Sequence, residues 1–463
     1  MARRLRRGIV MLALLALAPA GRAEESPAPA GEQGWQDAVR ERDDRIGNLE
    51  RKVDVLIEEL ARVRTQVAVP EEAELTPLYG LGPAASKVYG VERGLSLGGY
   101  GEFFYRNFIG QEEAGGDTLP EGTFSDRQLD RADFLRLVMY MGYKFTDRIV
   151  FNSEIEFEHA LTGEETFSAE SGEVTVEFAA LDFFWKEWAN ARAGLLLLPM
   201  GFLNEVHEPP FFHGVSRPEV ENRILPTTWR ENGAGLFGRL GENVEYRAYV
   251  VSGFNAAGFS DGGIREGRQQ GNRALTEDFG FVVRGDWTGI EGLVLGGSFY
   301  TGDSGQDQTV VDTGLELPDA RLTIWEAHAQ WRRRQLEARA LFAMSFLSDA
   351  NEINLALGRD ANEPIAEQML GGYVELAYDV WPTLFGGAEK YLAPFVRVEY
   401  VDTQLEVPSA FTRNDARRTW VFTPGLTFKP HPNVALKLEY RNFAPIGSTE
   451  RPDELSLGMG FAF

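Results

Sequence analysis

A proline-rich stretch near the middle of the chain carries the densest group of side chains whose types could act on a solute. The apolar run Leu195–Leu198 stops at Pro199, and strand-like sequence resumes at Gly233–Phe237. So long an irregular insertion between strands is usually functional, although an ordinary surface excursion is the alternative. We interpret residues 199–231 as a loop folded into the mouth of a membrane β-barrel, where it narrows the pore. The side chains that this pore constriction would present to a solute are Glu205, His207, Glu208, His213, Arg217, Glu219, Glu221, Arg223, Arg230 and Glu231.

Four of these residues are also of the types that bind a divalent cation, namely Glu205, His207, Glu208 and His213. The two histidines have HxxxxxH spacing on a proline-rich loop, with no helix to align them. That spacing does not favour the geometry that a metal requires. We therefore expect no metal and no cofactor.

The sequence shows no nucleophile motif of the kind that a barrel-embedded hydrolase needs, which is a Ser/His pair oriented by a third group. Spacing alone leaves His159 and His328 open as candidates. We expect a protein that is not an enzyme and has no catalytic residues, and a barrel enzyme is the weaker hypothesis.

Charged side chains recur at alternate positions of the predicted strands. In Arg148–Glu158, Ile155 and Phe157 fall on one face, and Glu154 and Glu156 fall on the other. The apolar face needs lipid or a core, and the charged face needs water. Such charges either brace the wall or create a mixed-sign field that orients charged solutes. The predicted pore-lining residues are Arg136, Glu154, Glu156, Glu245, Arg247, Glu337, Arg339, Arg397, Glu399, Lys437, Glu439 and Arg441.

Sixteen alternating segments between residues 95 and 463 predict the fold, an all-β, 16-stranded antiparallel transmembrane β-barrel porin domain. Short and long connections alternate along the chain, which a soluble β-helix or β-sandwich would not require. The twelfth connection, Val380–Lys390, breaks this pattern and indicates either a short helix or a miscounted strand. The last strand ends at Phe463 and resembles the assembly signal of outer-membrane barrels.

Composition supports a barrel and excludes other classes. The 463 residues include no cysteine, so neither disulfides nor thiolate metal sites can stabilise the fold. A mean hydropathy of -0.25 is too polar for a bundle of membrane helices. The net charge of -24 argues against nucleic acid as a partner, because phosphates demand basic surfaces.

The amino-terminal part predicts a signal peptide and then a coiled coil. Residues 1–23 combine clustered arginines with an apolar core too short to span a bilayer, although a retained anchor is the alternative. A linker (24–34) precedes a heptad pattern over 35–69, which ends before a second linker (70–94). The pattern leaves open whether the coiled coil contains two or three helices. The alternative is a single amphipathic helix that lies on the barrel of its own chain. The coiled-coil seam contains Val39, Ile46, Leu49, Val53, Leu56, Leu60 and Val63.

The segment GLLLLPMGFLNEVHEPPFFHGVSRPEVENRILPTTWRENGAGLFG, from Gly194 to Gly238, resembles the corresponding region of the phosphate-selective porin O and P family. This resemblance implies a trimeric, sixteen-stranded porin with a constriction loop. The phosphate path of that family depends on a ladder of arginines and a ring of lysines, whereas this chain interleaves its arginines with glutamates. No phosphate-binding residue is therefore carried over. The coiled coil resembles that of some siderophore-uptake porins.

We therefore expect a porin of the bacterial outer membrane with its coiled coil in the periplasm, which lets small hydrophilic or charged solutes diffuse passively. Its expected partners are two further copies in a homotrimer, outer-membrane lipid and the barrel-assembly machinery. The alternatives are a structural tether that uses the coiled coil, and a siderophore-type uptake porin. The sequence leaves the solute, the ion preference and the openness of the channel undecided.

The heptad pattern makes a testable prediction. Replacing Ile46, Leu49, Val53 and Leu56 together with Asn should weaken self-association, because the apolar seam of a coiled coil would be lost. Analytical ultracentrifugation of the detergent-solubilised protein measures the effect. An oligomer that survives intact would assign assembly to the barrel walls alone.

Overall fold

The computed structural model describes residues 40, 42, 44–49, 51–55, 76–109, 130–159, 172–447 and 451–463. The chain divides into two compact units, residues 1–63 and residues 64–463, which are described separately. Within the described residues no helix has both the length and the apolar character needed to cross a membrane. The predicted signal peptide lies outside the described residues.

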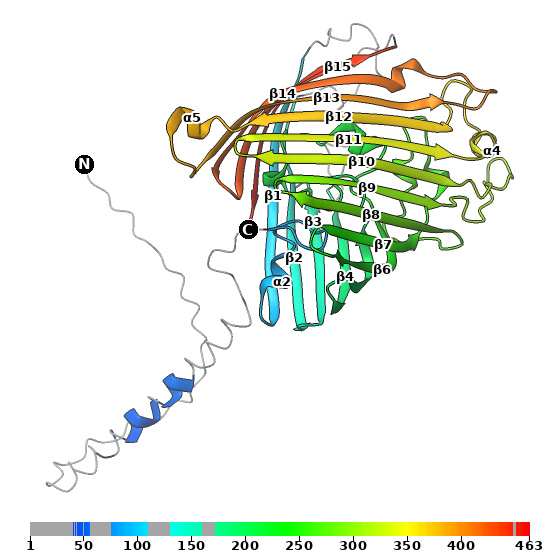
Figure 1. The fold of residues 1–463 in the computed structure, drawn as a ribbon. Helices are drawn as coiled ribbons and strands as arrows, with labels where there is room; N and C mark the ends of the chain where they lie inside the picture. Colours follow the sequence, from blue (N-terminus) through cyan, green and yellow to red (C-terminus); the bar gives the residue numbers. More distant parts are fainter. Residues whose placement is uncertain are drawn as a thin grey trace, which may run out of the picture. The chain divides into compact units, whose positions relative to one another are not determined.

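The second unit is a closed barrel in which every strand pairs antiparallel with its neighbours in sequence (Figure 1). Strand β1 pairs with β16, from Tyr100 opposite Ala462 to Ile109 opposite Asp453, and this pairing closes the sheet. The predicted sixteen-stranded antiparallel barrel is therefore confirmed. The strands are β1 (Gly94–Ile109), β2 (Arg131–Thr146), β3 (Ile149–Glu158), β4 (Val174–Lys186), β5 (Ala189–Leu197), β6 (Arg230–Leu240), β7 (Val244–Ser252), β8 (Phe279–Ile290), β9 (Leu293–Gly302), β10 (Leu322–Arg333), β11 (Leu336–Leu347), β12 (Gln368–Tyr378), β13 (Tyr391–Glu406), β14 (Arg418–His431), β15 (Val434–Pro445) and β16 (Asp453–Ala462).

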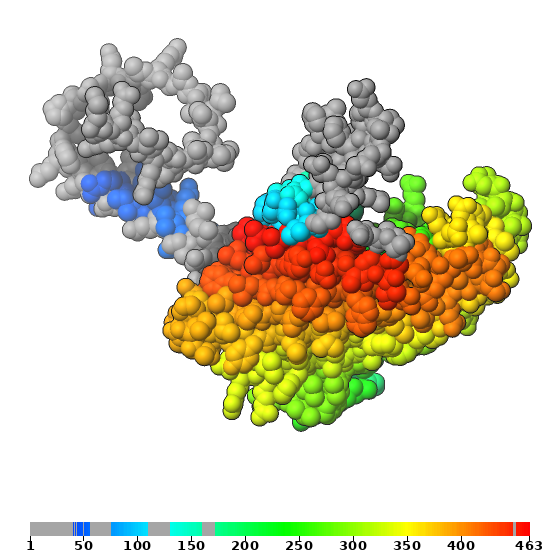
Figure 2. All heavy atoms as spheres, turned by 90° about the horizontal axis from the view of Figure 1, so that it is seen from above, coloured from blue at the N-terminus to red at the C-terminus, as the bar shows by residue number. Residues whose placement is uncertain are grey.

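The alternating sequence of each strand produces an apolar outside and a charged inside. On β16 the outward side chains of Leu455, Leu457 and Met459 are exposed, whereas Glu454 and Ser456 are buried within the barrel. Figure 2 shows the orange to red strands β13–β16 side by side as one continuous outer surface, and cyan atoms adjoin its red edge. An apolar outer band of this kind requires lipid around it.

Short turns and long connections lie at opposite ends of the barrel, because neighbouring strands run antiparallel. The twelfth connection contains helix α5, which confirms the short-helix alternative and leaves the strand count unchanged. The helical elements of the barrel unit are α2 (Lys87–Gly90), η2 (Pro209–Phe211), α3 (Glu219–Arg223), η3 (Ala256–Gly258), η4 (Arg265–Gly267), α4 (Ala350–Ala356), α5 (Trp381–Phe385) and η5 (Asp415–Arg417).

A segment just before β1 lies inside the barrel against its wall. This lumen segment, residues 78–91, includes α2 and falls where the sequence analysis placed a linker. Asn152 on β3 donates to the carbonyl of Ala85 at 2.8 Å. A Cβ at Gly142 would lie 2.5 Å from the Val88 side chain, so only glycine allows this close approach. The lumen segment is therefore packed against the inner wall.

The first unit is described only in part. Residues 44–49 and 51–55 are helical, as the heptad pattern predicts, and the seam residues Ile46, Leu49 and Val53 are exposed. The other predicted seam residues, Val39, Leu56, Leu60 and Val63, lie outside the described residues. The coiled coil between chains stays a prediction.

Candidate lumen constriction

The connection between β5 and β6 leaves the wall and crosses the inside of the barrel. We call this connection, residues 198–229, the lumen loop. The amide nitrogen of the buried Asn204 donates to the carbonyls of Leu198 (2.6 Å) and Trp229 (2.8 Å), and its oxygen accepts the Trp229 amide at 2.5 Å. One side chain thus joins the two ends of the lumen loop and satisfies a buried backbone amide there.

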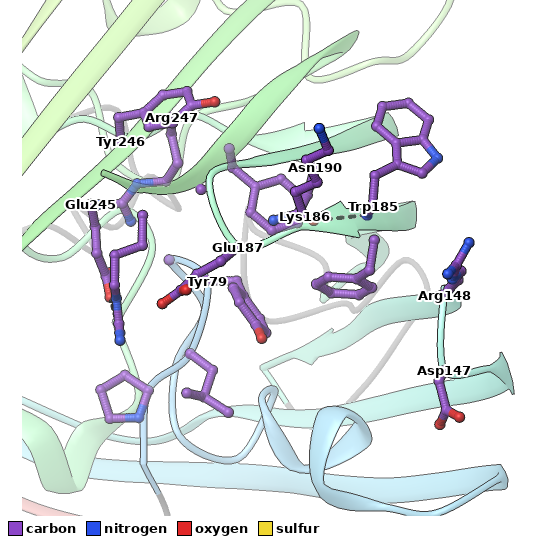
Figure 3. A pocket seen from close by; sticks show the side chains of 17 residues that line it. Tyr79, Asp147, Arg148, Trp185, Lys186, Glu187, Asn190, Glu245, Tyr246 and Arg247 are labelled. Atoms are coloured by element: carbon purple, nitrogen blue, oxygen red, sulfur yellow. Dashed lines mark hydrogen bonds and ion pairs between the residues drawn. The ribbon is translucent and has the colours of Figure 1, made fainter. Parts of the chain in front are cut away.

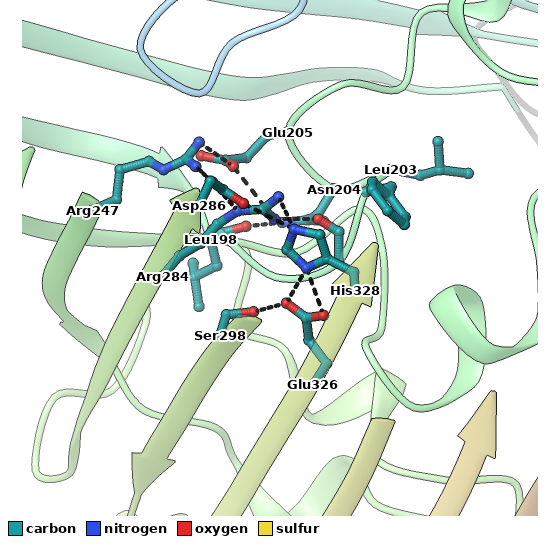
Figure 4. Close-up of polar contacts among 12 residues, drawn as sticks. Leu198, Leu203, Asn204, Glu205, Arg247, Arg284, Asp286, Ser298, Glu326 and His328 are labelled. Carbon is teal, nitrogen blue, oxygen red and sulfur yellow. Dashed lines mark hydrogen bonds and ion pairs between the residues drawn. The ribbon is translucent and has the colours of Figure 1, made fainter. Parts of the chain in front are cut away.

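Charged side chains of β7 and β8 hold the first part of the lumen loop (Figure 4). Arg247 donates to Glu205 at 2.7 Å and also pairs with Asp286. Arg284 donates to the carbonyl of Gly201 and, at 2.8 Å, to Asp286. The two arginines therefore bind both the loop and a carboxylate of the wall, so that all of these buried charges are paired.

The middle of the lumen loop is held by strand β15 on the other side of the barrel. Lys437 donates to the carbonyl of Gly214 at 2.7 Å. Glu439 accepts the backbone amides of Val215 and Ser216, each at 2.9 Å. These hydrogen bonds to ionised groups replace the water that the backbone of a surface loop would bind.

Helix α3 fixes the last part of the lumen loop. The amide of Glu219 donates to Glu399 on β13 at 2.7 Å, and its carboxylate accepts from Arg441 on β15 at 2.6 Å. Glu221 accepts the hydroxyl of Tyr373 on β12 at 2.6 Å. The loop is therefore attached to the wall along its length.

The other residues named from the sequence are also engaged within the barrel unit. Glu231 and Arg230 lie on β6, because that strand includes the last two residues of the predicted loop. The remaining contacts are Arg136 with Glu102 and Glu156, Glu154 with His207, Glu208 with the Ala84 and Ala85 amides, Arg217 with Thr228, Arg223 with Glu219, Arg230 with Glu177, Glu231 with Ser252, Glu245 with Arg239, Glu337 with Arg332 and Tyr391, Arg339 with the Phe211 carbonyl, and Arg397 with Glu375 and Glu399.

Two cavities lie in different halves of the barrel. A cavity of about 710 Å³ opens among the short turns, between Tyr79 of the lumen segment and Arg148, Glu187 and Arg247 (Figure 3). The second cavity, of about 460 Å³, lies towards the long connections and is bordered by the lumen loop. We call the second one the arginine cavity. Its charged lining comprises seven arginines, Arg106, Arg136, Arg217, Arg223, Arg265, Arg441 and Arg451, and four glutamates, Glu102, Glu158, Glu219 and Glu454.

Arginines outnumber glutamates in the lining of the arginine cavity, so this lining carries a formal surplus of positive charge. Burial, together with the neighbouring Arg268 and Arg217, lowers the pKa of Arg265 in the connection between β7 and β8. Two guanidinium nitrogens of Arg217, Nε and Nη2, are buried and have no hydrogen-bond partner among the described residues. An anion in this cavity would be stabilised by both groups.

The four residues considered for a cation site are not brought together. Glu205 contacts Arg247, and Glu208 accepts the amides of the lumen segment. His213 stacks on Phe395 and contacts Thr427 at 3.0 Å. His207 instead faces Glu154 and Glu177 on the wall.

The sequence analysis did not identify Glu177 as an inward-facing residue. Strict alternation along β4 would place Glu177 and Phe178 on opposite faces of the wall. Glu154 is paired with Phe178 and Ile155 with Val176, so Glu177 is the extra residue of a β-bulge. Both Glu177 and Phe178 are buried. The exposed residues of β4 have even numbers up to Val176 and an odd number at Leu181, which is a change of parity. That change of parity is the one signal in the sequence that could have indicated the bulge.

The two histidines left open for catalysis have other partners. His328 contacts Asp286 and Glu326, each at 2.9 Å. Ser298 donates to Glu326 rather than to His328, and His159 pairs with Asp133 at 2.7 Å. These contacts are those of an ion-pair network and do not form a nucleophile with its base.

Comparison with known proteins places the chain in a family. No family model matches it. A protein of Aquifex aeolicus (strain VF5), described as an uncharacterized protein, is 36% identical over 390 residues, which are 82% of this chain and 82% of that protein. The chain belongs to the same family as this Aquifex protein. The resemblance to the phosphate-selective porins stays a hypothesis.

Several solved structures are similar to this chain in fold. Salmonella typhi OmpF, solved in a complex with daunomycin, is similar with a TM-score of 0.52 and 12% identity over 80% of this chain and 98% of OmpF. The outer membrane channel DcaP of Acinetobacter baumannii gives a TM-score of 0.48 and 13% identity over 80% of this chain and 97% of DcaP. The likeness to OmpF shows that this chain has the barrel fold of a porin.

The base of the lumen loop generates a prediction. Asn204→Ala leaves the buried amide of Trp229 without its acceptor, which costs about 1–3 kcal/mol. Amide hydrogen exchange in residues 198–229 should therefore accelerate roughly tenfold to 100-fold, as measured by mass spectrometry. Asn232→Ala, which removes an exposed hydrogen bond to Gly271, is the control and should change little. Equal exchange in the two variants would show that Asn204 does not hold the loop.

Proposed function

We propose that the protein is a passive channel of the bacterial outer membrane whose lumen is narrowed by residues 198–229. The observation that carries this proposal is the attachment of the lumen loop to opposite sides of the barrel, through Arg247 on β7 and through Lys437 and Glu439 on β15. A loop held in this way lies across the path of a solute, and it borders the arginine cavity.

The chemistry of the interior supports a path for hydrophilic solutes. The inner wall carries ion pairs such as Arg136 with Glu156 and Arg397 with Glu399, where a sealed anchor could use an apolar core. Polar interiors are typical of water-filled barrels. We propose transport rather than catalysis as the function, with small hydrophilic or charged solutes as cargo.

The arginine cavity refines this proposal. Its seven arginines and four glutamates give a positive surplus in a chain whose net charge is -24. Clefts that gather one sign of charge raise the local concentration of the opposite ion. We therefore propose that anions enter preferentially. A siderophore-type uptake porin would be a more specialised form of the same channel.

The predicted coiled coil and the last strand, β16, suggest a location and an assembly for the protein. We propose that the carboxyl-terminal strand ending in Phe463 directs the barrel-assembly machinery to insert the protein into outer-membrane lipid. The coiled coil would lie in the periplasm and hold a homotrimer together. Exposure of the seam residues Ile46, Leu49 and Val53 within one chain supports a partner at this position.

The second candidate is a structural tether in which the barrel serves only as an anchor. One observation favours it, namely that Glu154, Arg397, Glu399 and Glu439 on the inner wall are fully buried. Such burial means that the loop and the lumen segment fill much of the interior. A barrel sealed in this way would not conduct ions.

Conductance in planar bilayers separates the two candidates. A channel should give discrete current steps, and deletion of residues 205–223 should enlarge them because the lumen loop is removed. Excision of residues 310–316, in the connection between β9 and β10 where Val311 is exposed, is the control and should leave the steps unchanged. No current from the folded wild-type protein would support the tether, and an unchanged step after the loop deletion would contradict the constriction.

Ion preference is predicted from the arginine cavity. Under a gradient of KCl the reversal potential should have the sign of an anion-selective channel. Arg217→Gln should shift it towards cation selectivity, because a buried guanidinium would be lost from the cavity. Arg321→Gln, which removes an exposed cation paired with Asp303, should leave it unchanged. Cation selectivity of the wild type would contradict the predicted preference.

A further inference from the structure

The contact between the lumen loop and strands β3 and β4 contains three potential metal ligands. His207 Nε2 lies 3.1 Å from Glu154 Oε1 and 3.3 Å from Glu177 Oε2. One ligand atom from each of the three residues lies within 4.8 Å of the others, and all three side chains are buried. Two wall residues and one loop residue therefore converge on one point.

The β-bulge in β4 is what completes this cluster. In a regular strand that faces β3, neighbouring residues point to opposite sides of the wall. The extra residue at Glu177 lets its carboxylate point inward beside Glu154, in addition to Phe178. Bulges of this kind commonly aim a side chain at a functional site.

The hydrogen bond that His207 Nδ1 makes leaves Nε2 directed towards the two carboxylates. Nδ1 lies 3.2 Å from the carbonyl oxygen of Asn204, which can only accept, so Nδ1 carries a hydrogen. In a neutral imidazole Nε2 then has a lone pair, and this lone pair faces two carboxylate oxygens. Three electron-rich atoms in contact require a cation between them, either a proton or a metal ion.

The carboxylates have capacity left for such an ion. Glu154 Oε2 and Glu177 Oε2 are buried and have no hydrogen-bond partner among the described residues. Arg230 contacts the other oxygen of Glu177, Oε1, at 3.3 Å. Buried carboxylate oxygens are normally satisfied, so these atoms indicate a missing ligand.

We propose that Glu154, Glu177 and His207 bind a divalent transition metal ion, with zinc as the best fit. The ligand atoms of a tetrahedral zinc ion, each about 2.0–2.2 Å from the metal, are separated by about 3.3 Å. The two distances from His207 Nε2 match this separation. Imidazole and carboxylate are both zinc ligands, and the Asn204 carbonyl orients the imidazole as metal-bound histidines require.

The proposed ion would connect the lumen loop to the wall. His207 belongs to the loop, whereas Glu154 and Glu177 belong to strands β3 and β4. The Tyr100 ring and the His207 imidazole pack edge to face with centroids 5.9 Å apart, which limits the space around the imidazole. Such a site would be structural, and it does not depend on whether the barrel conducts.

Metal content of the full chain, produced without a histidine tag, tests the proposal. The protein is unfolded in urea with a chelator, refolded in detergent with ZnCl₂, washed and analysed by mass spectrometry for zinc. The chain contains five histidines and no cysteine, so few imidazole ligands and no thiolate ligands compete for the ion. We expect about one zinc ion per folded wild-type chain, and visible absorption bands of tetrahedral coordination when CoCl₂ replaces ZnCl₂.

Matched variants locate the ion. His207→Gln and Glu177→Gln should each weaken zinc binding at least about tenfold, because a direct ligand contributes more than the neighbours that orient it. His213→Gln changes another buried histidine of the same loop and should bind zinc as the wild type does. Folding of each variant is checked by its heat-modifiable migration on gels. If His207→Gln does not fold, the zinc binding of Glu177→Gln alone tests the site.

Two results would overturn the proposal. Folded wild-type protein without zinc after refolding would show that a proton holds the three groups together. Zinc binding that is unchanged in a folded His207→Gln or Glu177→Gln variant would place the ion elsewhere.

Discussion

The structure depends on one constraint, which is that a backbone segment inside a barrel must have its amides and carbonyls hydrogen-bonded. Water satisfies a surface loop, but the lumen loop is enclosed by the wall. The wall supplies the missing partners as charged side chains, for example Glu439 for two consecutive amides and Lys437 for a carbonyl. These bonds to ionised groups are stronger than neutral ones and so define one position of the loop.

The same constraint explains why the inner wall is rich in pairs of opposite charge. A lone buried charge is costly, whereas a charge that pairs with its neighbour and also binds the loop backbone is compensated. Arg284 and Arg247 show the arrangement, because each contacts both a wall carboxylate and a residue of the loop. Charges that border the arginine cavity, such as Arg217, have fewer partners among the described residues.

Sequence was sufficient for the elements whose signal is periodic. Strands alternate with a period of two, so Leu455, Leu457 and Met459 could be assigned to the outer face and the sixteen strands could be counted. Prolines and charges also marked the lumen loop. The sequence could not indicate which wall residue each loop residue would meet, because those contacts join positions far apart in the chain, by more than 200 residues between Val215 and Glu439.

Two features lacked a clear sequence signal for a physical reason. The lumen segment around Ala84 and Ala85 is short and rich in small residues, so it reads as a linker until the loop carboxylate of Glu208 is seen to accept its amides. The bulge at Glu177 reverses which alternate residues of β4 face inward, and it does so within a few residues. A periodic pattern is recognised over a whole strand, so it does not reveal so short a change.

The position of the lumen loop inside the barrel can be measured directly, because the natural chain has no cysteine. The Cβ of Val215 lies 3.5 Å from the place that a Cβ at Gly458 on β16 would occupy, which is a separation that a disulfide accepts. The double variant Val215→Cys with Gly458→Cys should form an intramolecular disulfide on mild oxidation, identified by mass spectrometry of the folded protein. Pairing Val215→Cys with Gly285→Cys on β8 is the control. A folded Val215→Cys/Gly458→Cys protein whose thiols stay free would contradict an inward loop.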